Sequence, residues 1–143
     1  MNDRHDRLRQ EIWKRLAGQQ TVFLATADGD QPRLRPVTLI RFQSRLFFAT
    51  GSTNAKAKQI MQNPKTEFCL MFGRKGNRGT IRAECTATII KEKNIKAEIY
   101  NNVPLLSEFW KSSEDSGYAL IELRPTGFEY YSPGSVEAIR VKL

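Results

Sequence analysis

A strict two-residue alternation between Thr80 and Ile90 restricts the fold of this chain more than any other feature. Apolar side chains occupy every second position, and the intervening positions carry Thr, Arg and Glu. Successive side chains of an extended strand point to opposite faces, so the pattern predicts a strand with one face in a core and one in water. Such strands are typical of antiparallel sheets. The expected inward positions are Ile81, Ala83, Cys85, Ala87 and Ile89.

Other segments also have strand patterns, bounded by Gly, Pro, Asn or Asp. In the segment 33–42 we expect the even positions, from Leu34 to Phe42, to form the apolar face. Six or seven short strands with few helices predict a mainly β protein, an antiparallel barrel with helical additions. The expected strands cover residues 21–27, 33–42, 45–50, 66–72, 80–90, 118–123 and 127–131.

Helical patterns occur at the start of the chain and between the strands. Leu8, Ile12 and Leu16 are spaced by four residues, which predicts an N-terminal helix over about residues 3–17 that Gly18 can end. We also expect helices after Gly51 and over residues 91–100 and 105–110. A chain of 143 residues has the size of one domain, so we expect residues 1–143 to form a single domain with the barrel over about 21–131.

The composition argues against several classes of protein. With 40% hydrophobic and 27% charged residues, the chain has the balance of an ordinary globular protein. No apolar run approaches the roughly 20 residues of a membrane span, and the N-terminus lacks the apolar stretch of a signal peptide. We therefore expect a cytoplasmic protein with no membrane partner.

The few cysteine and histidine residues argue against a metal site and against nucleophilic catalysis. Cys69 and Cys85 fall in apolar strand patterns, where a reduced thiol behaves as a small hydrophobic group. His5, the single histidine, lies in a polar N-terminal segment. Because zinc sites require closely spaced Cys and His ligands, we expect no metal. No catalytic residue can be named from the sequence.

The segment from Thr50 to Lys56 is a candidate anion site, since a strand there runs through a turn of small residues into a helix. The backbone N–H groups and the dipole of a helix N-terminus attract an anion. Ser52 and Thr53 add hydroxyl donors, Lys56 adds a charge, and Arg35 on the preceding strand can add a planar fork. On spacing alone, a simpler interpretation is that Ser52 or Thr53 only caps the helix.

The net charge of +8 and the pI of about 9.8 also indicate an anionic partner. A phosphorylated small molecule, a nucleic acid or an acidic surface would each fit this charge, which cannot distinguish them.

The order of the motifs resembles the pyridoxamine 5′-phosphate oxidase-like FMN-binding split-barrel family, and within it the branch of general stress protein 26. The similarity covers about residues 21–131. It rests on the segments 32–39, 47–50, 56–64 and 127–131, of which the second and third flank the candidate anion site. The resemblance implies a six-stranded antiparallel split β-barrel, FMN as cofactor and a homodimer with flavin at the interface.

The resemblance also assigns roles to individual residues. Arg35 and the three residues after it match the strand that lies along the flavin, and Thr50 matches the threonine that closes the third strand. Lys56 matches the lysine that meets the phosphate, and Ser52 and Thr53 precede it. The predicted cofactor-binding residues are therefore Arg35, Pro36, Val37, Thr38, Thr50, Ser52, Thr53 and Lys56.

Three departures from the oxidase pattern limit what the resemblance implies. The oxidases have Ser-Arg-Lys where this chain has Asn54, Ala55 and Lys56, so one phosphate-binding charge is missing. Ile40 stands where the oxidases carry a lysine. The C-terminal Trp and Arg-x-His elements that hold pyridoxal phosphate are absent from residues 132–143, so we do not expect pyridoxamine phosphate as the substrate.

Three functional hypotheses follow. The first is an FMN-dependent oxidoreductase acting on an unidentified small molecule, with the protein supplying position and electrostatics. The second is a non-enzymatic flavin-binding or stress-response protein. The third, which the resemblance disfavours, is a basic barrel that binds nucleic acid with a steep salt dependence. The sequence excludes neither deazaflavin nor haem as the cofactor.

Phe109 is expected in the core, and the role of Trp110 is left open.

Overall fold

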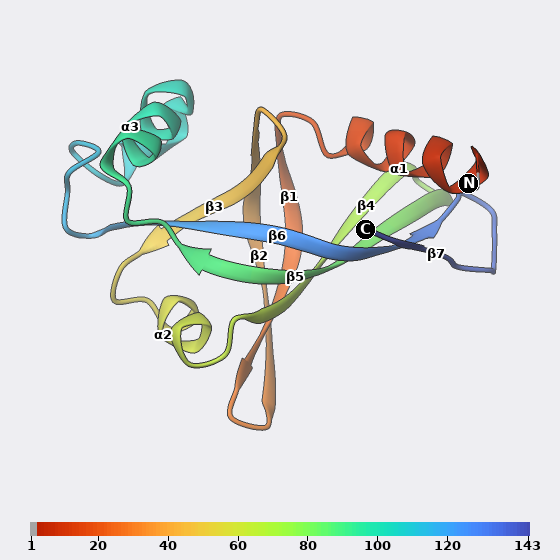
Figure 1. The fold of residues 1–143 in the computed structure, drawn as a ribbon, viewed down its shortest axis with the longest axis horizontal. Helices are drawn as coiled ribbons and strands as arrows, with labels where there is room; N and C mark the ends of the chain where they lie inside the picture. The colour runs from red at the N-terminus through yellow and green to blue at the C-terminus, as the bar shows by residue number, and fades with distance from the viewer. Residues whose placement is uncertain (1–2) are drawn as a thin grey trace.

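The computed structural model describes residues 3–143, which form seven strands, three α-helices and one 3-10 helix (Figure 1). Residues 1 and 2 of the predicted 1–143 domain lie outside the described part. The elements in chain order are α1 (Asp3–Arg15), β1 (Gln19–Asp28), β2 (Gln31–Phe42), β3 (Arg45–Gly51), α2 (Ala55–Gln62), β4 (Lys65–Arg74), β5 (Asn77–Ile89), α3 (Lys93–Asn102), η1 (Pro104–Glu108), β6 (Tyr118–Tyr131) and β7 (Ile139–Lys142).

The strands form one antiparallel sheet in which the first six close into a ring. Hydrogen-bonded neighbours follow the order β3-β2-β1-β4-β5-β6-β7, and β3 also pairs with β6. This second pairing, from Leu46 opposite Leu123 to Gly51 opposite Tyr118, closes the ring. β7 extends the sheet along β6. The predicted fold class, mainly β with six antiparallel strands and helical additions, is therefore confirmed.

The alternation in β5 places its side chains as predicted. Ile81 and Ala83 are fully buried, and Cys85 and Ala87 are nearly so, whereas Ile89 is only partly buried at the end of the strand. These side chains point into the ring and form the main core together with residues of every other ring strand. The core thus follows from the two-residue period of the sequence.

A second, smaller apolar cluster lies outside the ring, between the closing strands and the segment α3–η1. It contains Ile40 and Phe47 from the strands and Ile99 and Leu106 from the helices, all buried. The cluster explains why the prediction of a single apolar face on β2 is wrong. Leu34 on that face is exposed, whereas the consecutive residues Leu39 and Ile40 are both buried because one faces the main core and the other faces this cluster.

The end of the chain also differs from the prediction. The two strands expected at 118–123 and 127–131 are one continuous strand, β6, which runs through Pro125. The pairing with β5 shifts register between Glu84 and Cys85, and this irregularity accommodates the proline, which has no N–H to donate. The sequence did not predict β7, which consists of only four residues.

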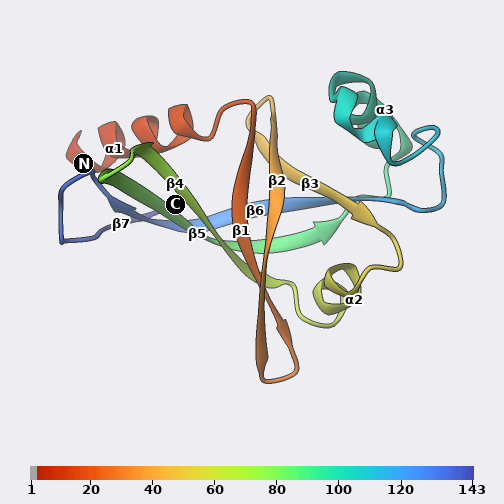
Figure 2. The same cartoon turned by 180° about the vertical axis from the view of Figure 1, so that it is seen from behind.

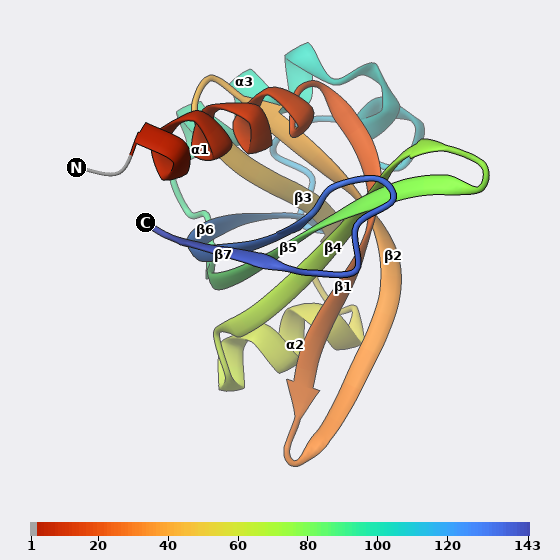
Figure 3. The same ribbon diagram turned by 90° about the vertical axis from the view of Figure 1, so that its right-hand side faces the viewer.

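The helices cover opposite ends of the ring. α1 and α2 lie at opposite ends in all three views (Figures 1, 2 and 3), and each buries an apolar face against the core. In Figure 1, β3 ends between α2 below it and α3 above it. The end of β3 is therefore the place where the ring, the candidate anion turn and the α3–η1 insertion meet.

None of the helices formed by residues 3–143 is both long and apolar enough to cross a membrane. Within the same residues, no group of three or more Asp, Glu, His and Cys side chains could hold a metal ion. Cys69 and Cys85 are free thiols, and burial raises the pKa of both.

Candidate functional site

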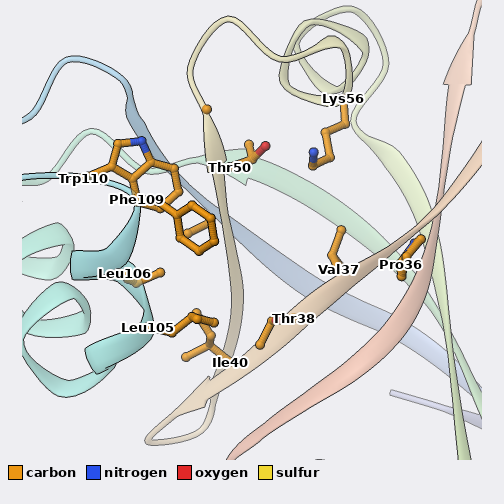
Figure 4. A pocket seen from close by; sticks show the side chains of 12 residues that line it. Pro36, Val37, Thr38, Ile40, Thr50, Lys56, Leu105, Leu106, Phe109 and Trp110 are labelled. Carbon is orange, nitrogen blue, oxygen red and sulfur yellow. The ribbon is translucent and has the colours of Figure 1, made fainter.

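A pocket of about 470 Å³ lies at the end of β3, where β2 and β3 separate. β2 pairs with β3 only from Ile40 to Phe42, and β3 then turns away to pair with β6. The gap left between the two strands is floored by side chains of both and bordered by α2 and η1 (Figure 4). The lining residues are Pro36, Val37, Thr38, Ile40, Ala49, Thr50, Gly51, Lys56, Leu105, Leu106, Phe109 and Trp110.

Five of the eight predicted cofactor-binding residues line this pocket: Pro36, Val37, Thr38, Thr50 and Lys56. The structure thus brings together residues from β2, β3 and α2 that the sequence separates by up to twenty positions. Their role toward a flavin stays a prediction. Figure 4 shows the Lys56 side chain extending from α2 toward Thr50, whose hydroxyl faces it.

Arg35 lies beside the pocket, on β2, with its guanidinium turned toward α2. It donates hydrogen bonds to Thr26 Oγ1 (2.8 Å) and Gln59 Oε1 (3.0 Å). Burial, and secondarily the charge of Arg33, lowers the pKa of Arg35. Burial, and secondarily the charge of Arg35, lowers the pKa of Lys56, so Lys56 lies within the electrostatic reach of Arg35.

No carboxylate neutralises this pair of cations within residues 3–143. The ion pairs of the described chain involve neither Arg35 nor Lys56. The Lys56 ammonium donates instead to the neutral side chain of Asn54, Nζ to Oδ1 at 3.1 Å. Two adjacent, half-buried and uncompensated positive charges favour the binding of an anion between or beside them.

The turn between β3 and α2 differs in detail from the predicted anion site. Asn54, rather than Ser52 or Thr53, caps α2 by accepting the backbone N–H of Lys56. Ser52 donates its hydroxyl to the carbonyl of Ser116 at 2.8 Å. The Thr53 side chain is exposed and makes no hydrogen bond to any described residue. The Ser52 hydroxyl proton is therefore occupied within the protein, and that of Thr53 is available.

The opposite side of the pocket is an apolar wall that the sequence did not predict. It consists of Leu105, Leu106, Phe109 and Trp110 from η1 and the residues after it. The prediction that Phe109 lies in the core is wrong, because its side chain is 68% exposed. The Val103-Pro104 start of a short helix, followed by adjacent Phe and Trp, was the available signal, but sequence alone did not place this insertion over β3.

Packing holds the aromatic part of this wall in place. The ring centroid of Trp110 lies 5.2 Å from that of Tyr118, the first residue of β6. The Tyr100 hydroxyl donates to the Trp110 carbonyl at 2.6 Å. Burial, and secondarily Tyr100, raises the pKa of Tyr118 to about 12. The pocket therefore joins a cationic end to a fixed aromatic end.

The comparisons with known proteins agree with this architecture. A family model described as pyridoxamine 5′-phosphate oxidase matches residues 8–132. No curated protein matches the chain. The structure of a NimC/NimA family protein from Clostridium acetobutylicum superposes with a TM-score of 0.76 at 25% identity, covering 96% of this chain and 91% of that one.

Two further structures extend the comparison. General stress protein 26 from Bacillus anthracis str. Sterne is 27% identical, with a TM-score of 0.73 over 92% of this chain and 97% of that one. A heme binding protein from Mycobacterium smegmatis has a TM-score of 0.73 over 91% of this chain and 55% of that one, and at 10% identity it shows the fold alone. The family model, together with the structures at 25% and 27% identity, confirms the predicted resemblance to the pyridoxamine 5′-phosphate oxidase family.

Proposed function

The chain belongs to the pyridoxamine 5′-phosphate oxidase family, and on that premise we propose that it is an FMN-binding flavoprotein, an oxidoreductase acting on a small molecule. One observation carries this proposal. A single pocket has Lys56 at one end and an apolar wall that includes Phe109 and Trp110 at the other, and a second uncompensated cation, Arg35, lies beside the pocket near Lys56. FMN has the same two ends, an anionic phosphate and a planar, mostly apolar ring system.

The residues present fit this cofactor in size and chemistry. The cavity lies within the range of about 300–1,000 Å³ that is usual for small-molecule sites. Hydrogen bonds to a charged phosphate contribute roughly 1.5–3 kcal/mol each. The free Thr53 hydroxyl in the turn, Lys56 in the first turn of α2 and Arg35 on β2 are the candidate donors. The aromatic wall would cover an apolar ring, and Thr38 and Thr50 offer hydroxyls in the pocket.

The bound flavin would supply hydride or electron transfer, which no protein side chain provides. The chain would position the flavin ring system between β2 and the apolar wall, and it would exclude water from one face of the flavin. Lys56 is the one lining residue with a titratable side chain. Because it is assigned to the phosphate, we expect substrate protons to come from solvent or from a partner subunit.

The proposal does not extend to pyridoxamine phosphate as the substrate. Residues 132–143 lack the Trp and Arg-x-His elements of the oxidases. They form β7 and the loop before it, at the end of the ring away from α2 and α3 (Figure 1), and contribute nothing to the pocket of their own chain.

We propose a homodimer as the functional unit, supported by an exposed apolar strip on the outer face of the sheet. Phe23 on β1 is 42% exposed and pairs with Pro36 on β2 and with Cys69 on β4. Leu34 and Met71, on the same face of these strands, are also exposed. Because Pro36 lines the pocket as well, a second copy on this strip would border the flavin. Sedimentation should give a dimer, which Phe23→Asp should dissociate.

A non-enzymatic flavin-binding protein is a second candidate, favoured by the lack of an acid or base other than Lys56 among the lining residues. Steady-state oxidation of NAD(P)H with common acceptors separates the two candidates. Rapid turnover supports the oxidoreductase, whereas bound flavin without turnover supports the carrier.

The absorption spectrum of the purified protein tests the central proposal. We expect flavin bands, or binding of added FMN measured by quenching of its fluorescence. A protein that shows neither, or that copurifies with haem bands instead, would contradict the proposal of a flavin. Deazaflavin would be recognised by its different spectrum.

A further inference from the structure

A buried polar cluster beside the pocket surrounds Arg35 with two residues, Thr26 and Gln59, that the predicted site does not include. Thr26 on β1 and Gln59 on α2 are 4% and 8% exposed, and the Thr26 hydroxyl donates to Gln59 Oε1 at 2.6 Å. Arg35 donates to both, through Nη1 to Thr26 Oγ1 and through Nη2 to Gln59 Oε1. The cluster thus joins two strands and a helix around one guanidinium.

Both neutral members occupy positions where the sequence pattern calls for apolar residues. Thr26 continues the inward face of β1 that begins with the fully buried Val22 and Leu24. Gln59 lies between Ala57 and Ile60 on the buried face of α2. An apolar pair of similar volume would pack here without the need to satisfy buried polar groups. The polar pair therefore calls for a reason other than packing.

The chemistry of the acceptors supplies that reason. Hydroxyl and amide oxygens fix the guanidinium by hydrogen bonds but carry no charge, so Arg35 keeps its full positive charge beside Lys56. A carboxylate at either position would hold the guanidinium equally well and would neutralise it. The observed choice of residues fixes a cation and leaves its charge available for an external anion.

We propose that Gln59 and Thr26 are positioning residues that hold the Arg35 guanidinium toward the phosphate of the ligand without neutralising it. The inference rests on the proposed function for the identity of that ligand. It assigns neither residue a contact with the flavin. Their effect should appear only in the part of the binding energy that comes from the phosphate.

The test compares FMN with riboflavin, which lacks the phosphate, in a set of variants. Gln59→Glu preserves the acceptor oxygen but adds a negative charge, Gln59→Met removes the acceptor, and Thr26→Val removes the hydroxyl at nearly constant shape. Gln62→Glu is the matched control, because Gln62 is exposed on the same helix. The ratio of the riboflavin Kd to the FMN Kd measures the contribution of the phosphate to binding.

We expect Gln59→Glu to lower this ratio by about ten-fold. Gln59→Met and Thr26→Val should lower it less, and Gln62→Glu should leave it close to that of the wild type. In an Arg35→Gln background, Gln59→Met should lower the ratio no further, since Gln59 acts through the guanidinium that this background lacks. A ratio that Gln59→Glu does not lower would overturn the inference, as would equal losses of FMN and riboflavin affinity.

A second readout separates failure of this inference from failure of the flavin proposal. If the wild type binds neither FMN nor riboflavin, the flavin proposal is wrong, and inorganic phosphate becomes the probe. Phosphate should then raise the thermal midpoint of the wild type and Gln62→Glu but not that of Gln59→Glu. No rise in the wild type, or an equal rise in all three proteins, would overturn the inference.

Discussion

Ser52 donates its backbone N–H to the carbonyl oxygen of Gly117 at 2.9 Å, which joins the end of β3 to the start of β6. The Ser52 hydroxyl strengthens this connection through Ser116. A Cβ added at Gly117 would lie 3.6 Å from the indole nitrogen of Trp110, so the loop also packs against the aromatic wall. The turn between β3 and α2 is therefore connected to the aromatic wall through the loop that precedes β6.

The first prediction distinguishes the two hydroxyls of the turn. Thr53→Ala should weaken FMN binding by about 1 kcal/mol, because Thr53 has a free donor, whereas Ser52→Ala should weaken it less. Ser52→Ala should instead lower the stability by about 0.5–1.5 kcal/mol, since its hydrogen bond lies within the protein. FMN titration and urea unfolding measure the two effects. The reverse order of FMN affinities would return Ser52 to the phosphate site.

The second prediction concerns Lys56. Lys56→Ala should weaken FMN binding by about 1–3 kcal/mol, as expected for a lost charge-assisted contact, and should leave riboflavin binding unchanged. Lys58→Ala, on the exposed side of the same helix, is the control. An unchanged FMN affinity in Lys56→Ala would remove Lys56 from the site.

The pH dependence of FMN affinity follows from the same residue and is our third prediction. Burial and Arg35 lower the pKa of Lys56 below the ordinary lysine value. The ammonium form binds phosphate, so affinity should be full below this pKa and should fall as the pH rises through it. The alkaline loss should be absent in Lys56→Ala. If the variant kept the same alkaline loss, another group would be responsible.

The fourth prediction uses the exposed wall residue. Phe109→Ala should weaken flavin binding by about 0.5–1.5 kcal/mol through lost ring contact. The free energy of unfolding should change by no more than about 0.5 kcal/mol, because Phe109 is 68% exposed. Met61→Ala, at a residue 73% exposed on α2 that does not line the pocket, is the control. Equal flavin affinity in both variants would show that the flavin ring system does not contact Phe109.

The fifth prediction concerns the ion pair that spans the ring closure. Arg45 binds Glu122 through two hydrogen bonds of 2.8 and 2.9 Å, and the bond to Arg45 lowers the pKa of Glu122. The pair thus stabilises the fold above the ordinary glutamate pKa, and this contribution is lost as the pH falls through the depressed value. Glu122→Gln should cost about 1 kcal/mol at neutral pH and progressively less in acid.

Urea unfolding at several pH values measures the contribution of this pair. Glu114→Gln, at an exposed carboxylate without an ion pair among the described residues, is the matched control. If Glu122→Gln cost the same at acid and neutral pH, the loss would come from packing rather than from the ion pair.

Local sequence patterns predicted much of the fold. The alternation in β5 placed Ile81 and Ala83 in the core, and the four-residue spacing predicted α1. The error at β2 arose because Leu39 and Ile40 face two different clusters, and the second exists only through contact with α3 and η1. Periodicity describes one buried face at a time, so it could not predict a strand end that is buried on both.

For the candidate site, the sequence by itself determined the local arrangement: a strand that passes through a turn of small residues into a helix carrying Lys56. Only the tertiary structure decided which groups stay available there, because the Ser52 donors are occupied by Ser116 and Gly117, sixty-four and sixty-five positions away. It also decided that Phe109 and Trp110 line one pocket together with Lys56, on opposite sides of it (Figure 4). Hydrogen-bond partners and exposure depend on contacts that the closing of β3 onto β6 creates, and a local pattern carries no information about them.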